Sequence, residues 1–283
     1  MAGHRPLTEP LPPVEKSSWK QVLMIGLLLF AVGVAVMRTT GNVKLFPTVT
    51  MIGSFLIPVV YTAYIYQHRR LSQLTLGITA MTFFYGGVLG AFTASLIEPM
   101  FIRKLTFSTA FVVGLIEEAA KIIGVVLIAR NRCDKTEING IVLGAAAGMG
   151  FAAMESNGYA LQAFLSSKGN FSAVVLVTLL RGIITPLGHG TWTAILAAVL
   201  FRESARCDFK VNGKVVGAYL LVAGLHGLWD GVPSLIGRLK LPDFGAFLSM
   251  AIVGGAGLFI LGRIWREAVI RQVAPLIDLD KAA

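Results

Sequence analysis

Long apolar runs recur along almost the whole chain of 283 residues, and they constrain its fold more than any other feature. A helix that spans a bilayer needs about 20 mostly apolar residues. Eight segments meet this requirement, at residues 19–37, 45–66, 74–96, 107–129, 138–164, 171–201, 214–237 and 243–262. The sequence therefore predicts an all-α, polytopic membrane protein with about eight transmembrane helices. Pro186 lies inside the overlong sixth segment, so we expect a kink or a tilted helix there.

The composition excludes a nucleic-acid-binding domain and most soluble enzymes of this size. Charged residues make up 14% of the chain, against about 25% in an ordinary soluble domain. The net charge is +10, but the basic residues lie between apolar runs, as loop charges that face an anionic leaflet do. We therefore expect the lipid bilayer as a partner, and no nucleic acid.

The chain divides into three predicted parts. Residues 1–18 are polar and rich in proline, which is typical of a disordered head. Residues 19–264 form the transmembrane domain, with a motif-bearing core at about 107–237, and residues 265–283 form a tail. Of the 25 Lys and Arg residues, 16 flank the spans on the side of both termini and seven on the other. This bias predicts cytoplasmic termini in a cell membrane, with Cys133 and Cys207 reduced in cytoplasmic loops.

Ionisable side chains inside the spans are the strongest functional signal. Each costs about 2.5–3.5 kcal/mol at a helix centre on insertion scales, so packing alone gives no reason to keep them. They are Glu117, Glu118, Lys121, Glu155, Arg181 and Asp230, joined by His189 and His226. Counting along four spans places the carboxylates and imidazoles about 17–26 Å from the cytoplasmic face. A common layer of this kind predicts a catalytic site or a substrate pathway.

Helical spacing groups these residues further. Lys121 follows Glu117 by four residues and Glu118 by three, so either carboxylate can pair with the ammonium. Adjacent glutamates in a low dielectric cannot both ionise cheaply, which suits a residue that exchanges protons, although a buried ion pair that locks the helix is the alternative. On the next span Glu155 and Tyr159 share a face.

The sixth and seventh spans add two further patterns. Arg181 precedes His189 in R-x4-P-x2-H, and its guanidinium either neutralises a carboxylate or holds a substrate carbonyl. In H-G-L-W-D, Asp230 follows His226 by four residues, where it could orient the imidazole. Glycines also recur every four residues from Gly140 to Gly148, which predicts tight helix packing.

The charge balance of this layer allows a metal without requiring one. Four carboxylates face Lys121 and Arg181, and one Zn²⁺ or two protons would balance the excess. His189, His226 and Glu155 would make a three-ligand zinc site with an open position for water. The motifs H-E-x-x-H, G-x-S-x-G and Walker A are absent from the sequence. The pattern favours water activated by glutamate or by metal.

Four motifs together resemble the PrsW family of intramembrane proteases, within the superfamily of CAAX prenyl proteases. They are E-E-A-A-K at 117–121, G-F-A-A-M-E-S-N-G-Y at 150–159, R-G-I-I-T-P-L-G-H at 181–189 and H-G-L-W-D at 226–230. They follow the family's order, one on each of four successive spans.

The resemblance implies a protease that cuts peptide bonds of protein or peptide substrates in or near the membrane. By motif, Glu117 and Glu118 supply the base that activates water, and His189 and His226 bind metal or stabilise the oxyanion, with Asp230 supporting His226. Glu155 stands where the CAAX branch has a histidine, which leaves its role open. Lys121, Arg181 and Tyr159 are candidates for charge pairing or substrate contact.

Two other functions compete with this interpretation. Buried Glu, Asp, Lys and His also form proton relays in ion-coupled transporters, although we find no convincing internal repeat of the kind that transporters often show. A non-catalytic membrane scaffold would keep the fold without turnover. The complete set of carboxylates and histidines favours the protease.

Overall fold

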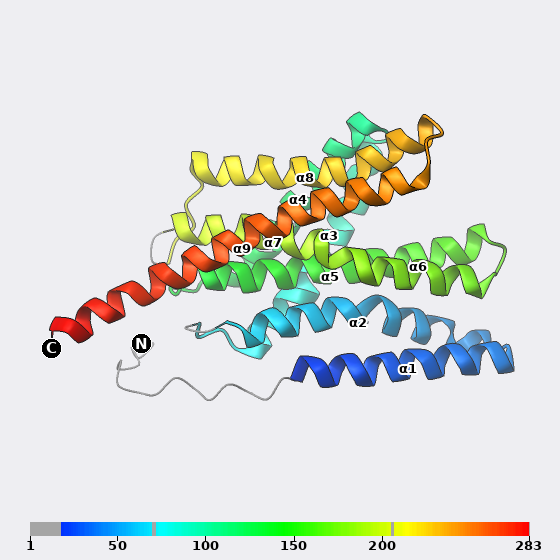
Figure 1. Ribbon diagram of the computed structural model, residues 1–283, viewed down its shortest axis with the longest axis horizontal. Helices are drawn as coiled ribbons and strands as arrows, with labels where there is room; N and C mark the ends of the chain where they lie inside the picture. The colour runs from blue at the N-terminus through cyan, green and yellow to red at the C-terminus, as the bar shows by residue number, and fades with distance from the viewer. Residues whose placement is uncertain (1–17, 70–71, 205–206, 283) are drawn as a thin grey trace.

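The computed structural model describes residues 18–69, 72–204 and 207–282, and helices account for most of them (Figure 1). The elements are α1 (Ser18–Thr40), η1 (Val43–Leu45), α2 (Phe46–Gln67), α3 (Leu76–Phe101), α4 (Phe107–Ala129), α5 (Glu137–Ser166), α6 (Phe171–Ile184), η2 (Thr185–Leu187), α7 (His189–Glu203), α8 (Gly213–Arg238) and α9 (Asp243–Ala282). Each of the eight predicted segments is helical. The predicted all-α fold is confirmed.

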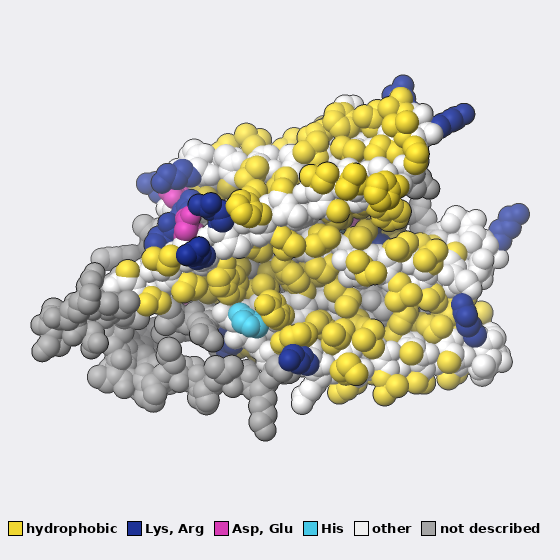
Figure 2. All heavy atoms as spheres, viewed as in Figure 1, with side chains coloured by type: hydrophobic (Ala, Val, Ile, Leu, Met, Phe, Trp, Pro, Cys, Tyr) yellow, Lys and Arg dark blue, Asp and Glu magenta, His cyan; other side chains and the backbone are white. Residues whose placement is uncertain are grey.

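Seven stretches in the described part of the chain are long and apolar enough to cross a membrane, with α6, η2 and α7 counted as one. The segment at 107–129 also forms a helix, α4, of 23 residues. It is not among the seven because it carries three charged residues, Glu117, Glu118 and Lys121, in its middle. Apolar side chains cover the flank of the bundle, and Lys and Arg gather at its two ends (Figure 2). The chain is therefore a polytopic membrane protein.

The break predicted at Pro186 divides the sixth segment into two helices. α6 ends at Ile184, a single 3-10 turn contains the proline, and α7 begins at His189. Proline has no N–H to donate and its ring clashes with the preceding turn, so a continuous α-helix is interrupted here. The interruption places His189 at the first position of a new helix.

The centre of the bundle is α5, which packs between α2, α3 and α7 (Figure 1). Every residue from 137 to 153 is buried, as is every residue of α7 from 189 to 201. Gly144 and Gly148 make this packing possible, because a Cβ atom on either would collide with the backbone oxygen of Thr193 or of His189. The predicted glycine stripe is thus a helix contact, and it fixes the height of His189 against α5.

Two helices are longer than predicted. α3 continues to Phe101, five residues past the expected end, and so includes Glu98. α9 continues to Ala282, through the predicted tail. The predicted head lies outside the described residues except for Ser18, which begins α1.

The prediction of two reduced cysteines is wrong for this structure, in which Cys133 and Cys207 form a disulfide. Cys133 precedes α5 and Cys207 follows α7. Since α5 and α7 pack along each other, the two loops meet at one end of the bundle. Lys135 ties the same loops by donating to the carbonyl oxygens of Arg132 and Cys207. Our expectation rested on the compartment alone, and it ignored this proximity.

We expect the disulfide to stabilise the bundle, since it closes a loop with a sequence separation of 74 residues. Chain entropy predicts about 2–4 kcal/mol for a crosslink of this kind. Thermal unfolding in detergent should therefore shift to lower temperature on reduction, and a Cys133→Ser variant should melt like the reduced protein. Two free thiols in protein purified without reductant would contradict the bond.

Candidate active site

Four helices bring the predicted site residues to one place inside the bundle. α4 carries Glu117, Glu118 and Lys121, α5 carries Glu155, α7 begins with His189, and α8 carries His226 and Asp230. Glu117, Glu118, Lys121, His189 and His226 are all buried, and Glu155 and Asp230 are half-buried. The side chains that the span positions predicted to share one layer lie in a single cluster.

The ammonium of Lys121 is fully buried and donates to both adjacent glutamates. Its Nζ lies 3.0 Å from Glu117 Oε2 and 2.8 Å from Glu118 Oε1. It also lies 2.9 Å from His189 Nδ1 and 4.1 Å from the ring centre of Phe151. Such a cation offsets the desolvation of two carboxylates that would otherwise be buried without a counter-charge.

Both carboxylate oxygens of Glu118 have hydrogen-bond partners in the protein. Oε1 accepts from Lys121 and contacts His226 Nδ1 at 3.1 Å, while Oε2 accepts from the Thr193 hydroxyl at 3.0 Å. This residue is also fully buried. Glu118 is therefore placed to hold its neighbours, His226 among them, and Glu117 is the member of the pair that lies near both imidazoles.

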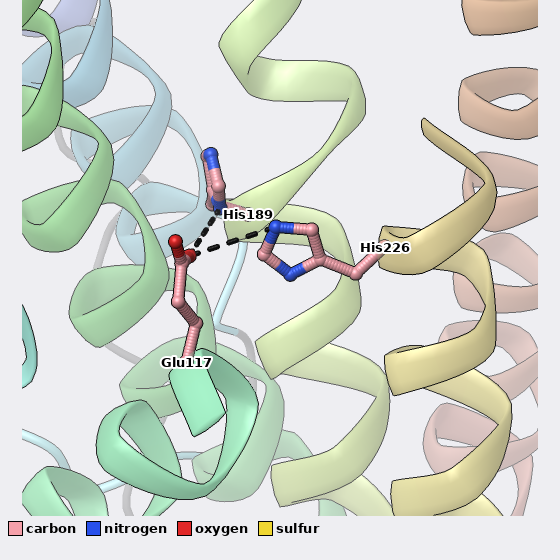
Figure 3. Close-up of side chains that lie close together, drawn as sticks. All are labelled: Glu117, His189 and His226. Carbon is pink, nitrogen blue, oxygen red and sulfur yellow. Dashed lines mark ion pairs between the residues drawn. The ribbon is translucent and has the colours of Figure 1, made fainter. Parts of the chain in front are cut away.

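Each histidine has one ring nitrogen against a carboxylate and the other toward Glu117. His189 Nε2 lies 3.0 Å from Glu155 Oε2, and His226 Nδ1 lies 3.1 Å from Glu118 Oε1. The opposite nitrogens, His189 Nδ1 and His226 Nε2, lie 3.9 and 3.6 Å from Glu117 Oε2 (Figure 3). A carboxylate against one ring nitrogen is how metal-binding histidines are usually oriented. In this structure the second nitrogen of each ring also has a protein neighbour, Lys121 at 2.9 Å from His189 Nδ1 and Asp230 at 3.4 Å from His226 Nε2.

These three residues could hold a divalent metal if the Lys121 ammonium, which lies 3.0 Å from Glu117 Oε2 and 2.9 Å from His189 Nδ1, moved aside. Glu117, His189 and His226 are buried and offer atoms that all lie within 4.8 Å of one another. In a tetrahedral zinc site with bonds of about 2.0–2.1 Å, ligand atoms are about 3.4 Å apart, close to the two distances to Glu117 Oε2. Two imidazoles and one carboxylate are a known donor set for catalytic zinc.

Glu155 takes a different place from the one predicted. We expected it as the third ligand, but its Oε2 contacts the nitrogen of His189 that faces away from Glu117. The same oxygen accepts from Arg181 at 2.6 Å. Arg181 also donates to Ser156 at 2.9 Å and stacks over the ring of Tyr159 at 4.3 Å. Arg181 thus neutralises Glu155, one of the two roles that the sequence left open for it.

Asp230 is close to His226, with Oδ2 3.4 Å from Nε2. The shorter contact of that ring is with Glu118, so Glu118 rather than Asp230 fixes its Nδ1 side. Asp230 instead lies next to the nitrogen that points at Glu117.

Sequence reasoning missed three residues of the cluster. Thr193 binds Glu118 and lies one helical turn after His189, a spacing that could have indicated it. Trp192 is fully buried and its ring centre lies 4.9 Å from that of His226 and 5.8 Å from that of His189. Glu98 lies beyond the predicted end of its span and belongs to no motif.

Comparison with known families agrees with the four motifs. A family model described as PrsW family intramembrane metalloprotease matches residues 71–256, a range that includes every residue of this cluster. No curated protein and no solved structure gives a significant match to the chain. The resemblance predicted from the motifs is confirmed.

Proposed function

The chain belongs to the PrsW family of intramembrane metalloproteases, and we propose that it hydrolyses peptide bonds at the cluster around Glu117, His189 and His226. The observation that carries this proposal is the convergence of one Glu117 oxygen and two carboxylate-oriented imidazole nitrogens inside the membrane domain. A cluster of this kind activates water and requires neither a serine nor a cysteine nucleophile.

We propose zinc as the metal, held by Glu117, His189 and His226. The His/His/Glu donor set supports zinc over magnesium or calcium, which prefer oxygen ligands alone. Such an ion supplies Lewis acidity toward water and toward the scissile carbonyl. Metal binding would displace the Lys121 ammonium from Glu117 Oε2 and His189 Nδ1, while Glu118 would remain its partner, and its charge would also favour an anion that develops on the carbonyl oxygen.

The remaining residues have positioning roles in this proposal. Glu118 and Glu155 hold the two rings in the tautomers that turn a lone pair toward Glu117. Arg181 keeps Glu155 in place, and Tyr159 supports Arg181. Asp230, half-buried, lies beside the His226 nitrogen that also faces Glu117. Glu117, as one of the three residues that would hold the metal, would lie beside the reacting water.

The depth of the cluster supports a membrane-embedded or membrane-proximal protein as the substrate. The charge bias of the loops supports cytoplasmic termini and a location in the cell membrane. The Cys133–Cys207 disulfide lies in loops that this orientation would place in the reducing cytoplasm, so it is the observation that opposes the orientation.

Cleavage that depends on Glu117 tests the proposal. We expect purified protein in zinc-supplied liposomes, mixed with membranes of its expression host, to generate new protein N-termini that chemical labelling and mass spectrometry detect. Glu117→Gln removes the negative charge shared by the imidazoles and Lys121, and its rate should fall about 10³-fold or more, as for other groups at the reacting centre.

The matched control is Glu267→Gln, which neutralises an exposed carboxylate on α9 whose contact is Arg271. It should cleave like the wild type. New N-termini that appear equally with wild type and Glu117→Gln would sink the proposal, because the proteolysis would then come from another protein.

A further inference from the structure

Glu98 is a fifth carboxylate of the cluster, and none of the four motifs contains it. It lies near the end of α3, and Glu117 is one of the groups that interact with its carboxyl group. Its other electrostatic neighbours are Glu155 on α5, His226 on α8 and Lys121 on α4. Glu98 is half-buried.

Its bonding differs from that of the other carboxylates. Glu117 and Glu118 have Lys121 at 3.0 and 2.8 Å, Glu155 has Arg181 at 2.6 Å, and Asp230 has His226 at 3.4 Å. Glu98 forms no ion pair with any residue that the structure describes, and its buried Oε1 has no hydrogen-bond partner there. An acceptor left without a donor costs about 1–3 kcal/mol when buried, so such groups call for an explanation.

We propose that Glu98 is an active-site residue whose free carboxylate oxygen accepts a hydrogen bond from a donor that the reaction places beside Glu117. This inference rests on the proposed proteolysis, for which it adds a residue. Two groups in that reaction carry a donor at this position, the attacking water and a peptide N–H next to the scissile bond. The kinetic constants affected by mutation distinguish them.

The geometry separates this role from metal binding. The buried group of ligand atoms within 4.8 Å of one another comprises Glu117, His189 and His226, and Glu98 is not part of it. It approaches Glu117, whose Oε2 is the atom turned toward the imidazoles. Its removal should therefore leave the metal in place.

The test compares Glu98→Ala and Glu98→Gln with the wild type in liposomes, using a purified membrane peptide that spans a cleavage site found by N-terminal labelling. We expect Glu98→Ala to lower kcat/KM about 10- to 100-fold, the range for one hydrogen bond to a charged group. Glu98→Gln keeps an amide oxygen that can accept, so its loss should be under about tenfold. A fall in kcat at constant KM identifies water as the donor, and a rise in KM at constant kcat identifies the peptide N–H.

Two further measurements guard against a purely structural role. Zinc content should stay at the wild-type value in both variants, and their melting temperatures should be unchanged or higher, because a carboxylate without a cation is removed from beside Glu117. A lower melting temperature or lost zinc would overturn the proposal, as would Glu98→Ala cleaving at the wild-type rate, with Glu267→Gln as the neutral reference. If the wild type shows no Glu117-dependent cleavage, the proposed function and the role of Glu98 both fall.

Discussion

Replacing His189 and His226 together by Ala is expected to leave a protein that folds but holds no metal. The wild type should contain about one tightly bound zinc per chain, as a three-ligand catalytic site does. His189 and His226 each supply one ring nitrogen, and Glu117 supplies a carboxylate oxygen, to the group of three ligand atoms that lie within 4.8 Å of one another. Glu117 alone cannot retain the ion, so zinc content measured by mass spectrometry after dialysis should fall to background.

Substitutions of the two carboxylates that contact the imidazoles distinguish loss of a metal ligand from loss of a residue that orients one. Glu155→Gln and Glu118→Gln leave the three ligands intact but weaken the orientation of one ring each, and metal affinity should drop about 10- to 100-fold. His68→Ala is the matched control, since His68 is exposed at the end of α2 and contacts the carbonyl oxygen of Tyr64. It should keep its zinc. Zinc retained by the double variant would contradict the proposed ligands, and a wild type that takes up no added zinc would favour activation of water by Glu117 alone.

The sequence predicted the fold because span length and hydropathy are local properties. Each of the eight apolar segments is helical, and the sixth is interrupted at Pro186, which lacks an N–H donor. Helices α2, α3 and α8 nevertheless continue through Pro58, Pro99 and Pro233. Helical spacing also predicted which residues share a face, so Lys121 contacts both Glu117 and Glu118 as expected. Counting residues along four spans predicted that their ionisable side chains share one layer, because the rise per residue of a helix is also a local property.

What the sequence could not predict depends on how the helices rotate against one another. Spacing along α5 does not say whether Glu155 faces Glu117 or the outer nitrogen of His189, and the structure shows the second. The disulfide depends on loops 74 residues apart that meet because α5 and α7 pack side by side. Glu98 lies in a final helical turn that hydropathy alone assigned to a loop.

Loss of the buried ammonium is the change with the largest expected effect on stability. Lys121→Met keeps the volume and the apolar stem but leaves Glu117 and Glu118 without their common cation. Removing one partner of a buried ion pair costs about 3–5 kcal/mol, because the remaining charge is desolvated and unpaired. The contact of the ammonium with the Phe151 ring is lost as well. Thermal unfolding in detergent should shift strongly to lower temperature.

A second substitution decides whether charge is the cause. Glu118→Gln in the Lys121→Met background removes one of the two carboxylates left without a cation, and it should recover part of the lost stability, whereas Lys44→Met, at an exposed position in η1, should change nothing. If Lys121→Met instead melts like the wild type, the two glutamates do not need the ammonium as a counter-charge. At least one of them would then already hold a proton, and the role of Lys121 would be confined to the reaction.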